Sequence, residues 1–127
     1  MKIKGVDLSY CQEGISFPAL KQAGVRFAII RAGFSTKKDV TMDKFVADCK
    51  KYGIDYGFYW YSYAMSVEQA LTEAEKCIEV IKTLSPTYPV FFDMEEKKQI
   101  SGLNTDTRTK MAIAFCEKIR QAGFKPG

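Results

Sequence analysis

Histidine is absent from this chain of 127 residues. Its absence excludes catalysis by a Ser/His/Asp triad or a Cys/His pair, and it removes most zinc sites of catalytic geometry. No apolar run approaches the roughly 18 residues of a membrane-spanning helix, and no basic and apolar leader opens the chain. We therefore expect no membrane insertion and no signal peptide. Carboxylates, tyrosines and lysines remain as acid and base candidates.

Motifs for cofactors and nucleic acids are also missing. The first predicted strand runs into Asp7-Leu8-Ser9-Tyr10-Cys11-Gln12 in place of a glycine-rich phosphate loop, which disfavours a dinucleotide fold. The net charge is only +4 and the lysine pairs are scattered, so we predict no nucleic-acid binding. The cysteines have no C-x-x-C spacing, and three fall on apolar helix faces, which indicates buried thiols. They are Cys11, Cys49, Cys77 and Cys116. We expect no metal and no cofactor.

The chain has enough apolar residues for a globular core, with 46% hydrophobic and 27% charged residues. Hydrophobic patterning predicts strands over residues 2–9, 25–32, 54–63 and 88–95. It predicts helices over residues 18–23, 42–52, 66–84 and from about 105 to the stop at Gly123, with loops between these elements. Strand followed by helix, four times over, is typical of a parallel α/β sheet with right-handed crossovers.

The stretch Tyr88–Glu95 carries the clearest chemical signal. Side chains alternate along a strand, so Phe91, Asp93 and Glu95 share one face, with the two acids roughly 6 to 7 Å apart at Cβ. In a cleft of low dielectric, repulsion between two carboxylates raises the pKa of one of them. Cleavage of a glycosidic bond needs such a pair, one acid and one anion. The alternative interpretation is a turn at Asp93 followed by a solvated acidic loop.

Polar side chains gather at the carboxyl ends of the predicted strands, where parallel α/β folds place their active sites. These residues are Asp7, Arg31, Tyr61, Tyr63, Asp93 and Glu95. The third strand is dense in aromatic residues, with Tyr59, Tyr61 and Tyr63 predicted on one face. Tyrosines combine a stacking surface with hydroxyls, which suits sugar rings, although aromatic strands also serve as plain core.

Four motifs in chain order give the sequence a family resemblance. They are Gly5–Ser9 followed by Gln12, then Phe27–Gly33, Gly57–Ala64 and Pro89–Glu95. Together they resemble the glycoside hydrolase family 25 lysozymes, the Chalaropsis-type muramidases of phage endolysins and bacterial autolysins. The resemblance runs along the whole chain. One departure is Cys11, which occupies the place of a tryptophan usual in the family.

The resemblance implies hydrolysis of the β-1,4 bond between N-acetylmuramic acid and N-acetylglucosamine in the peptidoglycan of cell walls, without metal or cofactor. By position, Glu95 would be the general acid, Asp93 its supporting partner and Asp7 a further carboxylate at the rim. Residues expected to bind the glycan are Tyr59, Tyr61, Tyr63, Gln12 and Arg31.

The implied fold is a TIM-like (β/α) barrel, of which this chain would supply about four βα units. Residues 1–127 would then form a single catalytic-type domain, about the N-terminal two-thirds of a family domain. Such an incomplete barrel would leave its first and fourth strands as free edges, through which we expect self-association. Two alternatives remain open: a glycan-binding module or inactive fragment without turnover, and a glycosidase for another amino-sugar polymer such as chitin.

Overall fold

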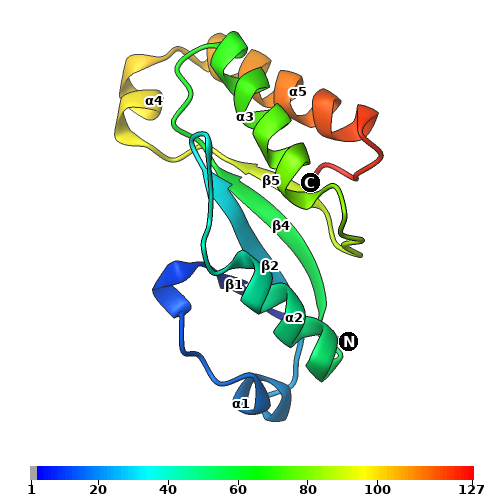
Figure 1. Ribbon diagram of the computed structural model, residues 1–127. Coiled ribbons are helices and arrows are strands. Elements are labelled where there is room, and N and C mark those ends of the chain that lie inside the picture. Colours follow the sequence, from blue (N-terminus) through cyan, green and yellow to red (C-terminus); the bar gives the residue numbers. More distant parts are fainter. Residues whose placement is uncertain (1–2) are drawn as a thin grey trace.

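Four parallel strands form the centre of the molecule (Figure 1). The computed structural model describes residues 3–127, so residue 2 of the predicted first strand lies outside the described residues. The strands are β1 (Lys4–Leu8), β2 (Val25–Phe34), β4 (Asp55–Tyr61) and β5 (Val90–Asp93), in the sheet order β1-β2-β4-β5. A two-residue strand, β3 (Lys37–Lys38), pairs antiparallel with β2. Spatial order follows chain order, so each crossover advances one strand in the same direction, as in a (β/α) barrel.

Helices follow the strands as the sequence predicts. They are α1 (Phe17–Gln22), α2 (Met42–Tyr52), α3 (Val67–Ile81), α4 (Lys97–Gly102) and α5 (Thr105–Gln121), with a 3-10 turn η1 (Tyr10–Gln12) after β1. Figure 1 shows α3 and α5 packed side by side, with α1 and α2 near the other half of the sheet. The Ser66 hydroxyl accepts a hydrogen bond from the Gln69 N–H and so caps the start of α3. Gly53 ends α2 in the left-handed conformation, with φ of 67°.

The two faces of the sheet differ in chemistry. Alternate residues of each strand are fully buried in the core: Leu8, Ile30, Phe58, Trp60 and Val90. The residues between them occupy the other face, because side chains alternate along a strand. There Asp7 lies opposite Ile29, Arg31 opposite Tyr59, and Tyr61 opposite Asp93. This second face therefore carries the polar residues predicted for the site.

Two glycines allow close packing on that second face, Gly5 against an aromatic ring and Gly57 against the backbone of β5's leading segment. The ring of Phe27 stacks on Tyr88 with centroids 4.3 Å apart. A Cβ added to Gly5 would lie 2.2 Å from the Phe27 ring, and one added to Gly57 would lie 2.5 Å from the Pro89 carbonyl. The amino-terminal end of the face is thus filled by rings, while the polar residues lie at the carboxyl end.

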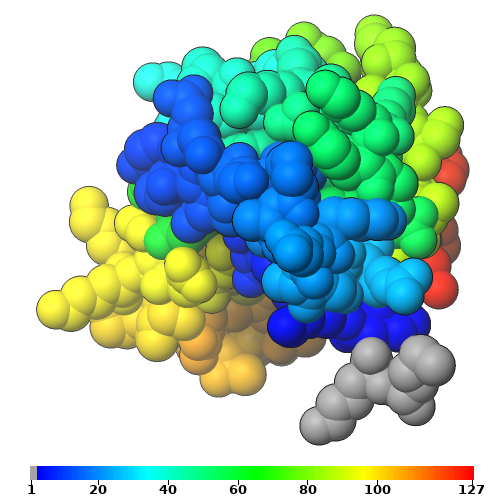
Figure 2. Space-filling model, turned by 90° about the horizontal axis from the view of Figure 1, so that it is seen from below, coloured from blue at the N-terminus to red at the C-terminus, as the bar shows by residue number. Residues whose placement is uncertain are grey.

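The structure corrects the predicted loop after β5. Residues 97–102 form helix α4, because Glu96 and Gln99 cap each other: the Glu96 N–H donates to Gln99 Oε1 at 3.2 Å. The predicted loops at 10–16 and 33–41 likewise contain η1 and β3. The third helix ends at Ile81, before the predicted end near Leu84. Figure 2 shows the molecule from below: the segment that includes α1 (blue) faces the viewer, and the segment that includes α4 (yellow) projects at the left.

The ends of the sheet are β1 and β5, as the sequence predicts. The outer edge of β5 is partly paired, since the Val90 N–H donates to the Lys125 carbonyl at 2.8 Å and the Gly127 N–H donates to the Val90 carbonyl at 2.9 Å.

Cys49 and Cys77 are buried thiols, and burial raises the pKa of each to about 12. Among the helices in residues 3–127, none combines the length and apolar character needed to span a bilayer.

Candidate active site

A cleft of about 540 Å³ opens on the polar face of the sheet, and we call it the carboxylate cleft. Its lining consists of Asp7, Ile29, Tyr59, Phe91, Phe92, Asp93 and Glu95. Asp7 comes from the end of β1, whereas Asp93 ends β5 and Glu95 follows it. All three acids named from the sequence therefore meet in one cleft, together with one of the predicted tyrosines.

Asp93 and Glu95 form a proton-sharing pair within the carboxylate cleft. Burial, the charge of Glu95, a hydrogen bond with Glu95 and the charge of Asp7 raise the pKa of Asp93 from 3.8 to about 6. Glu95 itself is exposed. Among the described residues, no lysine or arginine forms an ion pair with any of the three acids. The negative charge in the cleft is therefore uncompensated, and the pair holds a proton up to about pH 6.

Tyr59 connects the carboxylate cleft with a neighbouring cation. Burial raises the pKa of Tyr59, and the nearby side chain of Ser9 works against this rise. Arg31 is near enough to oppose that rise, whereas Asp7 and Asp93 add to it. In the sheet, Tyr59 on β4 lies between Arg31 on β2 and the strand β5 that carries Asp93.

A buried polar network anchors the backbone that carries the acids. The Ser62 hydroxyl donates to Glu73 at 2.6 Å and accepts from Gln99 Nε2 at 3.0 Å. Gln99 also accepts from the Glu96 N–H, and the Ser62 N–H donates to the Asp93 carbonyl at 2.8 Å. These bonds fix the chain on both sides of Glu95. Burial raises the pKa of Glu73, although its hydrogen bonds with Ser62 and the Tyr63 N–H work against the rise.

Sequence reasoning missed this network of Ser62, Glu73 and Gln99. Glu73 falls on a helix of ordinary amphipathic pattern, and nothing in its spacing predicts a partner on β4. The spacing of Glu96 and Gln99 is that of a capping box, and it was the available signal for α4 and for a buried glutamine.

Tyr61 and Tyr63 do not line the carboxylate cleft. The Tyr61 hydroxyl donates to Glu96 Oε2 at 2.6 Å, and this bond, with burial and nearby acids, raises the pKa of Tyr61. Tyr63 follows the end of β4, so strand alternation no longer governs its direction. It is 47% exposed and borders a separate pocket of about 340 Å³ with Ser35 and Glu73. Their proposed contact with substrate remains a prediction.

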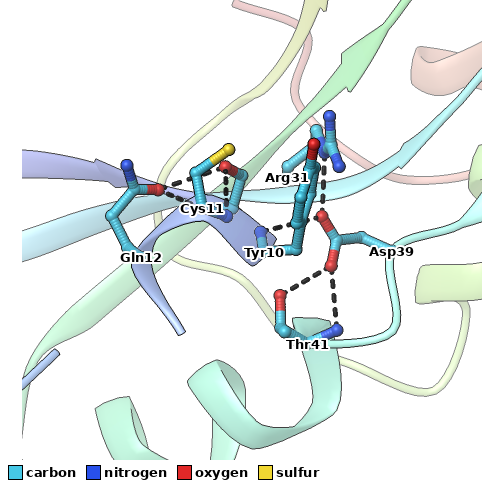
Figure 3. Close-up of polar contacts among 7 residues, drawn as sticks. Tyr10, Cys11, Gln12, Arg31, Asp39 and Thr41 are labelled. Carbon is cyan, nitrogen blue, oxygen red and sulfur yellow. Dashed lines mark hydrogen bonds and ion pairs between the residues drawn. The ribbon is translucent and has the colours of Figure 1, made fainter. Parts of the chain in front are cut away.

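Gln12 has a local role in the structure. Its Oε1 accepts from the Ser9 N–H at 2.8 Å and from the Ser9 hydroxyl at 3.1 Å, which closes the capping box of η1 (Figure 3). Gln12 therefore shapes the turn that follows Asp7, and it does not line the carboxylate cleft.

Arg31 lies in a second pocket of about 370 Å³, which we call the Arg31 pocket. Tyr10, Arg31, Phe34, Lys37, Lys38, Asp39 and Val40 line it. The guanidinium lies 4.9 Å from the ring centroid of Tyr10 and 4.8 Å from that of Phe34, so it is close to two aromatic rings. Its Nε donates to Asp39 Oδ2 at 2.8 Å (Figure 3).

Asp39 is a further site residue that sequence reasoning missed. Its side chain is 1% exposed, and its oxygens accept hydrogen bonds from Arg31, the Tyr10 N–H, the Thr41 N–H and the Thr41 hydroxyl. Burial alone would raise the pKa of Asp39, but the bonds from Thr41 and Arg31 more than offset it and hold the pKa below its usual value. An aspartate two residues before a threonine at a helix start was the available signal.

Within residues 3–127, no group of three or more cysteine or acidic side chains has the geometry to hold a metal ion. The groups available in the carboxylate cleft are the three acids, the rings of Phe91 and Phe92, and the partly buried Tyr59. Two carboxyl groups sharing one proton, with a third anion nearby, can protonate a leaving oxygen and stabilise a positive sugar carbon.

The family model for glycosyl hydrolases family 25 matches residues 6–127. The chain belongs to this family. The catalytic domain of the endolysin ply40 from Listeria bacteriophage P40 superposes with a TM-score of 0.80 at 26% identity, over 100% of this chain and 62% of that one. The autolysin LytC of Streptococcus pneumoniae superposes with a TM-score of 0.85 at 26% identity, over 97% of this chain and 31% of that one.

A family 25 glycosyl hydrolase from Bacillus anthracis, at 25% identity and a TM-score of 0.77, matches 98% of this chain and 58% of its own. The chain thus spans less than two thirds of each of these structures. A comparison with curated proteins found no match. The resemblance and the α/β fold class expected from the sequence are confirmed: the chain supplies the first parallel βα units of a TIM-like family 25 fold.

Proposed function

We propose that the carboxylate cleft hydrolyses the β-1,4 bond between N-acetylmuramic acid and N-acetylglucosamine, and that the protein acts on cell-wall peptidoglycan. Family 25 membership supports glycoside hydrolysis. LytC, which this chain resembles over 31% of its length, has been solved in complex with a synthetic peptidoglycan ligand. The observation that carries the proposal is the meeting of Asp7, Asp93 and Glu95 in one cleft. There the pKa of Asp93 is raised to about 6.

In this mechanism, Glu95 is the general acid because it is exposed toward a bound glycan and shares the proton of Asp93. The proton passes from Glu95 to the glycosidic oxygen as the bond to the sugar carbon breaks. Water then forms a new bond to this carbon, and the proton that it loses returns to the carboxyl pair. Asp93 is the supporting partner, and Asp7 supplies a negative charge that stabilises the oxocarbenium-like carbon. Tyr59 offers its ring and hydroxyl to the sugar.

A second candidate function is glycan binding without turnover. It is favoured by the aromatic side chains of Tyr59, Phe91 and Phe92, which line the cleft beside the acids. In that case the aromatic and acidic residues of the cleft would bind wall glycan but would not cleave it.

Digestion of purified peptidoglycan separates these two functions. We expect the 127-residue protein to release new reducing ends of N-acetylmuramic acid, and we expect Glu95→Gln to lower this release about 100-fold or more while leaving wall binding intact. Glu79→Gln, which changes an exposed acid on α3, is the matched control and should act as the wild type. Sedimentation with walls and no new reducing ends would support the binding module. Faster release from chitin would change the assigned substrate.

A further inference from the structure

The Arg31 pocket contains a cation whose hydrogen-bonding capacity is only partly used. Nε of Arg31 donates to Asp39, whereas in residues 3–127 its two Nη atoms have no hydrogen-bond partner and are not enclosed by the protein. The rings of Tyr10 and Phe34 lie within 4.9 Å of the guanidinium carbon, measured to their centroids. A further ligand must therefore approach the Nη edge, where two N–H groups point in parallel.

The charge of Asp39 does not block such a ligand. Its two oxygens already accept four hydrogen bonds from Arg31, Tyr10 and Thr41. Lys37 lines the same pocket and forms no ion pair within the described part of the chain, whereas Lys38 pairs with Asp43 at 2.7 Å. The pocket therefore has a net positive charge and one cation free to meet an anion.

The shape of the pocket favours a carboxylate on an apolar body. A carboxylate is planar, and it matches the two parallel N–H groups of a guanidinium with two hydrogen bonds. The rings of Tyr10 and Phe34, with the exposed Val40, provide apolar surface beside that edge. A phosphate or sulfate on a sugar would make little use of these apolar walls.

We propose that the Arg31 pocket binds a carboxylate of the short peptide that peptidoglycan carries on its muramic acid. This inference rests on the proposed function for the choice of substrate. Arg31 lies beside Tyr59 in the sheet, and Tyr59 lines the carboxylate cleft, so a glycan in the cleft would bring its peptide substituent toward the pocket. One region would then act on the sugar backbone while the other recognises the peptide.

Small soluble probes test this pocket without any hydrolysis. The probes are N-acetylmuramyl-L-alanyl-D-isoglutamine, the same compound with its carboxylate converted to an amide, and glycerol phosphate. Binding is followed by ¹H–¹⁵N spectra that include the Arg31 Nε–H signal, at low and at physiological salt. We expect the carboxylate probe to shift this signal and to bind at least about tenfold more tightly than the amide or glycerol phosphate.

Two variants locate the binding. Arg31→Lys keeps the charge but loses the two parallel donors, and it should weaken binding of the carboxylate probe about tenfold. Lys37→Gln, on the exposed rim, should weaken it two- to fivefold at low salt and less at high salt, and it keeps the test available if the first variant does not fold. Lys50→Gln is the control. Lys50 is exposed near the carboxyl end of α2, and this variant should bind the probe as the wild type does.

The proposal is overturned if the amide binds as tightly as the carboxylate, if glycerol phosphate binds more tightly, or if neither variant weakens binding. Because the probes contain no β-1,4 bond between sugars, their binding does not depend on turnover. Loss of wall hydrolysis with intact probe binding would instead count against the proposed function alone.

Discussion

The carboxylate cleft and the Arg31 pocket each contain a partly or fully buried aspartate, yet the two acids have opposite proton affinities. Asp39 has four hydrogen-bond donors and an arginine, and its pKa lies below the usual value. Asp93 has two acidic neighbours and no cation, and its pKa is raised to about 6. Burial acts in the same direction on both, so their partners make the difference.

This contrast separates a structural acid from a chemical one. A compensated carboxylate such as Asp39 stays ionised and stabilises the loop between β3 and α2. An uncompensated one such as Asp93 keeps a proton near neutral pH and can exchange it with a substrate. The following variants test whether the distinction holds, beginning with the largest expected effect.

Asp93→Asn should lower the release of reducing ends from peptidoglycan about 100-fold or more, because the proton-sharing pair is lost. In the wild type, activity should decline as pH rises above about 6, where the pair loses its proton. Without the Asp93 carboxyl, the declining limb should no longer lie near pH 6. A limb that stays in place would remove the pair from the role of proton donor.

Asp39→Ala should reduce the free energy of unfolding at pH 7 by about 3 kcal/mol, because Arg31 would remain largely buried without its counter-charge. Asp43 pairs with Lys38 and its side chain is 71% exposed. Asp43→Ala should therefore lower the free energy of unfolding by less than about 0.5 kcal/mol. Urea denaturation measures both. The pKa of Asp39 is lowered by folding, so its contribution is present above its unfolded pKa and disappears as pH falls through the folded value. Equal effects of the two variants would contradict the contrast.

The sequence predicted the parts of this comparison unequally. Asp7, Asp93 and Glu95 were recognisable because strand alternation and the carboxyl ends of parallel strands place such residues together. The four main strands and helices followed from hydrophobic period and from caps such as Ser66 and Gly53. These are local rules, and here local patterns agree with the fold.

What the sequence did not predict depends on contacts between distant segments. Glu73 meets Ser62 only because α3 packs beside the end of β4, and Arg31 turns to Asp39 because the short β3 folds back on β2. Tyr63 was assigned by alternation to the face of Tyr59, but β4 ends at Tyr61. Such pairings join residues from different elements, and no spacing along the chain encodes them.

Gln99→Ala tests the network that anchors the acidic segment, and it should destabilise the protein by about 2 kcal/mol. Gln99 is fully buried, and its amide bonds Ser62, the Ala64 carbonyl and the Glu96 N–H. Its removal leaves these groups unsatisfied and a cavity beside them. Gln69→Ala loses one exposed bond to the Met65 N–H and should cost below about 1 kcal/mol. Similar midpoints in urea for both variants would show that the network does not anchor this segment.

The smallest expected effect has the opposite sign. Folding raises the pKa of Asp93 from 3.8 to about 6, so between these values the folded state holds a proton that the unfolded state has released. Wild-type stability therefore falls as pH rises through this window, the reverse of the slope from Asp39. Asp93→Asn removes the charge and should be more stable by about 1 kcal/mol at pH 7, a value kept small because the group is partly exposed to solvent. The gain should vanish below about pH 4, and thermal unfolding at pH 3.5 and pH 7 measures it. A variant equally stable or less stable than the wild type at pH 7 would mean that the carboxylates of the cleft do not strain the fold.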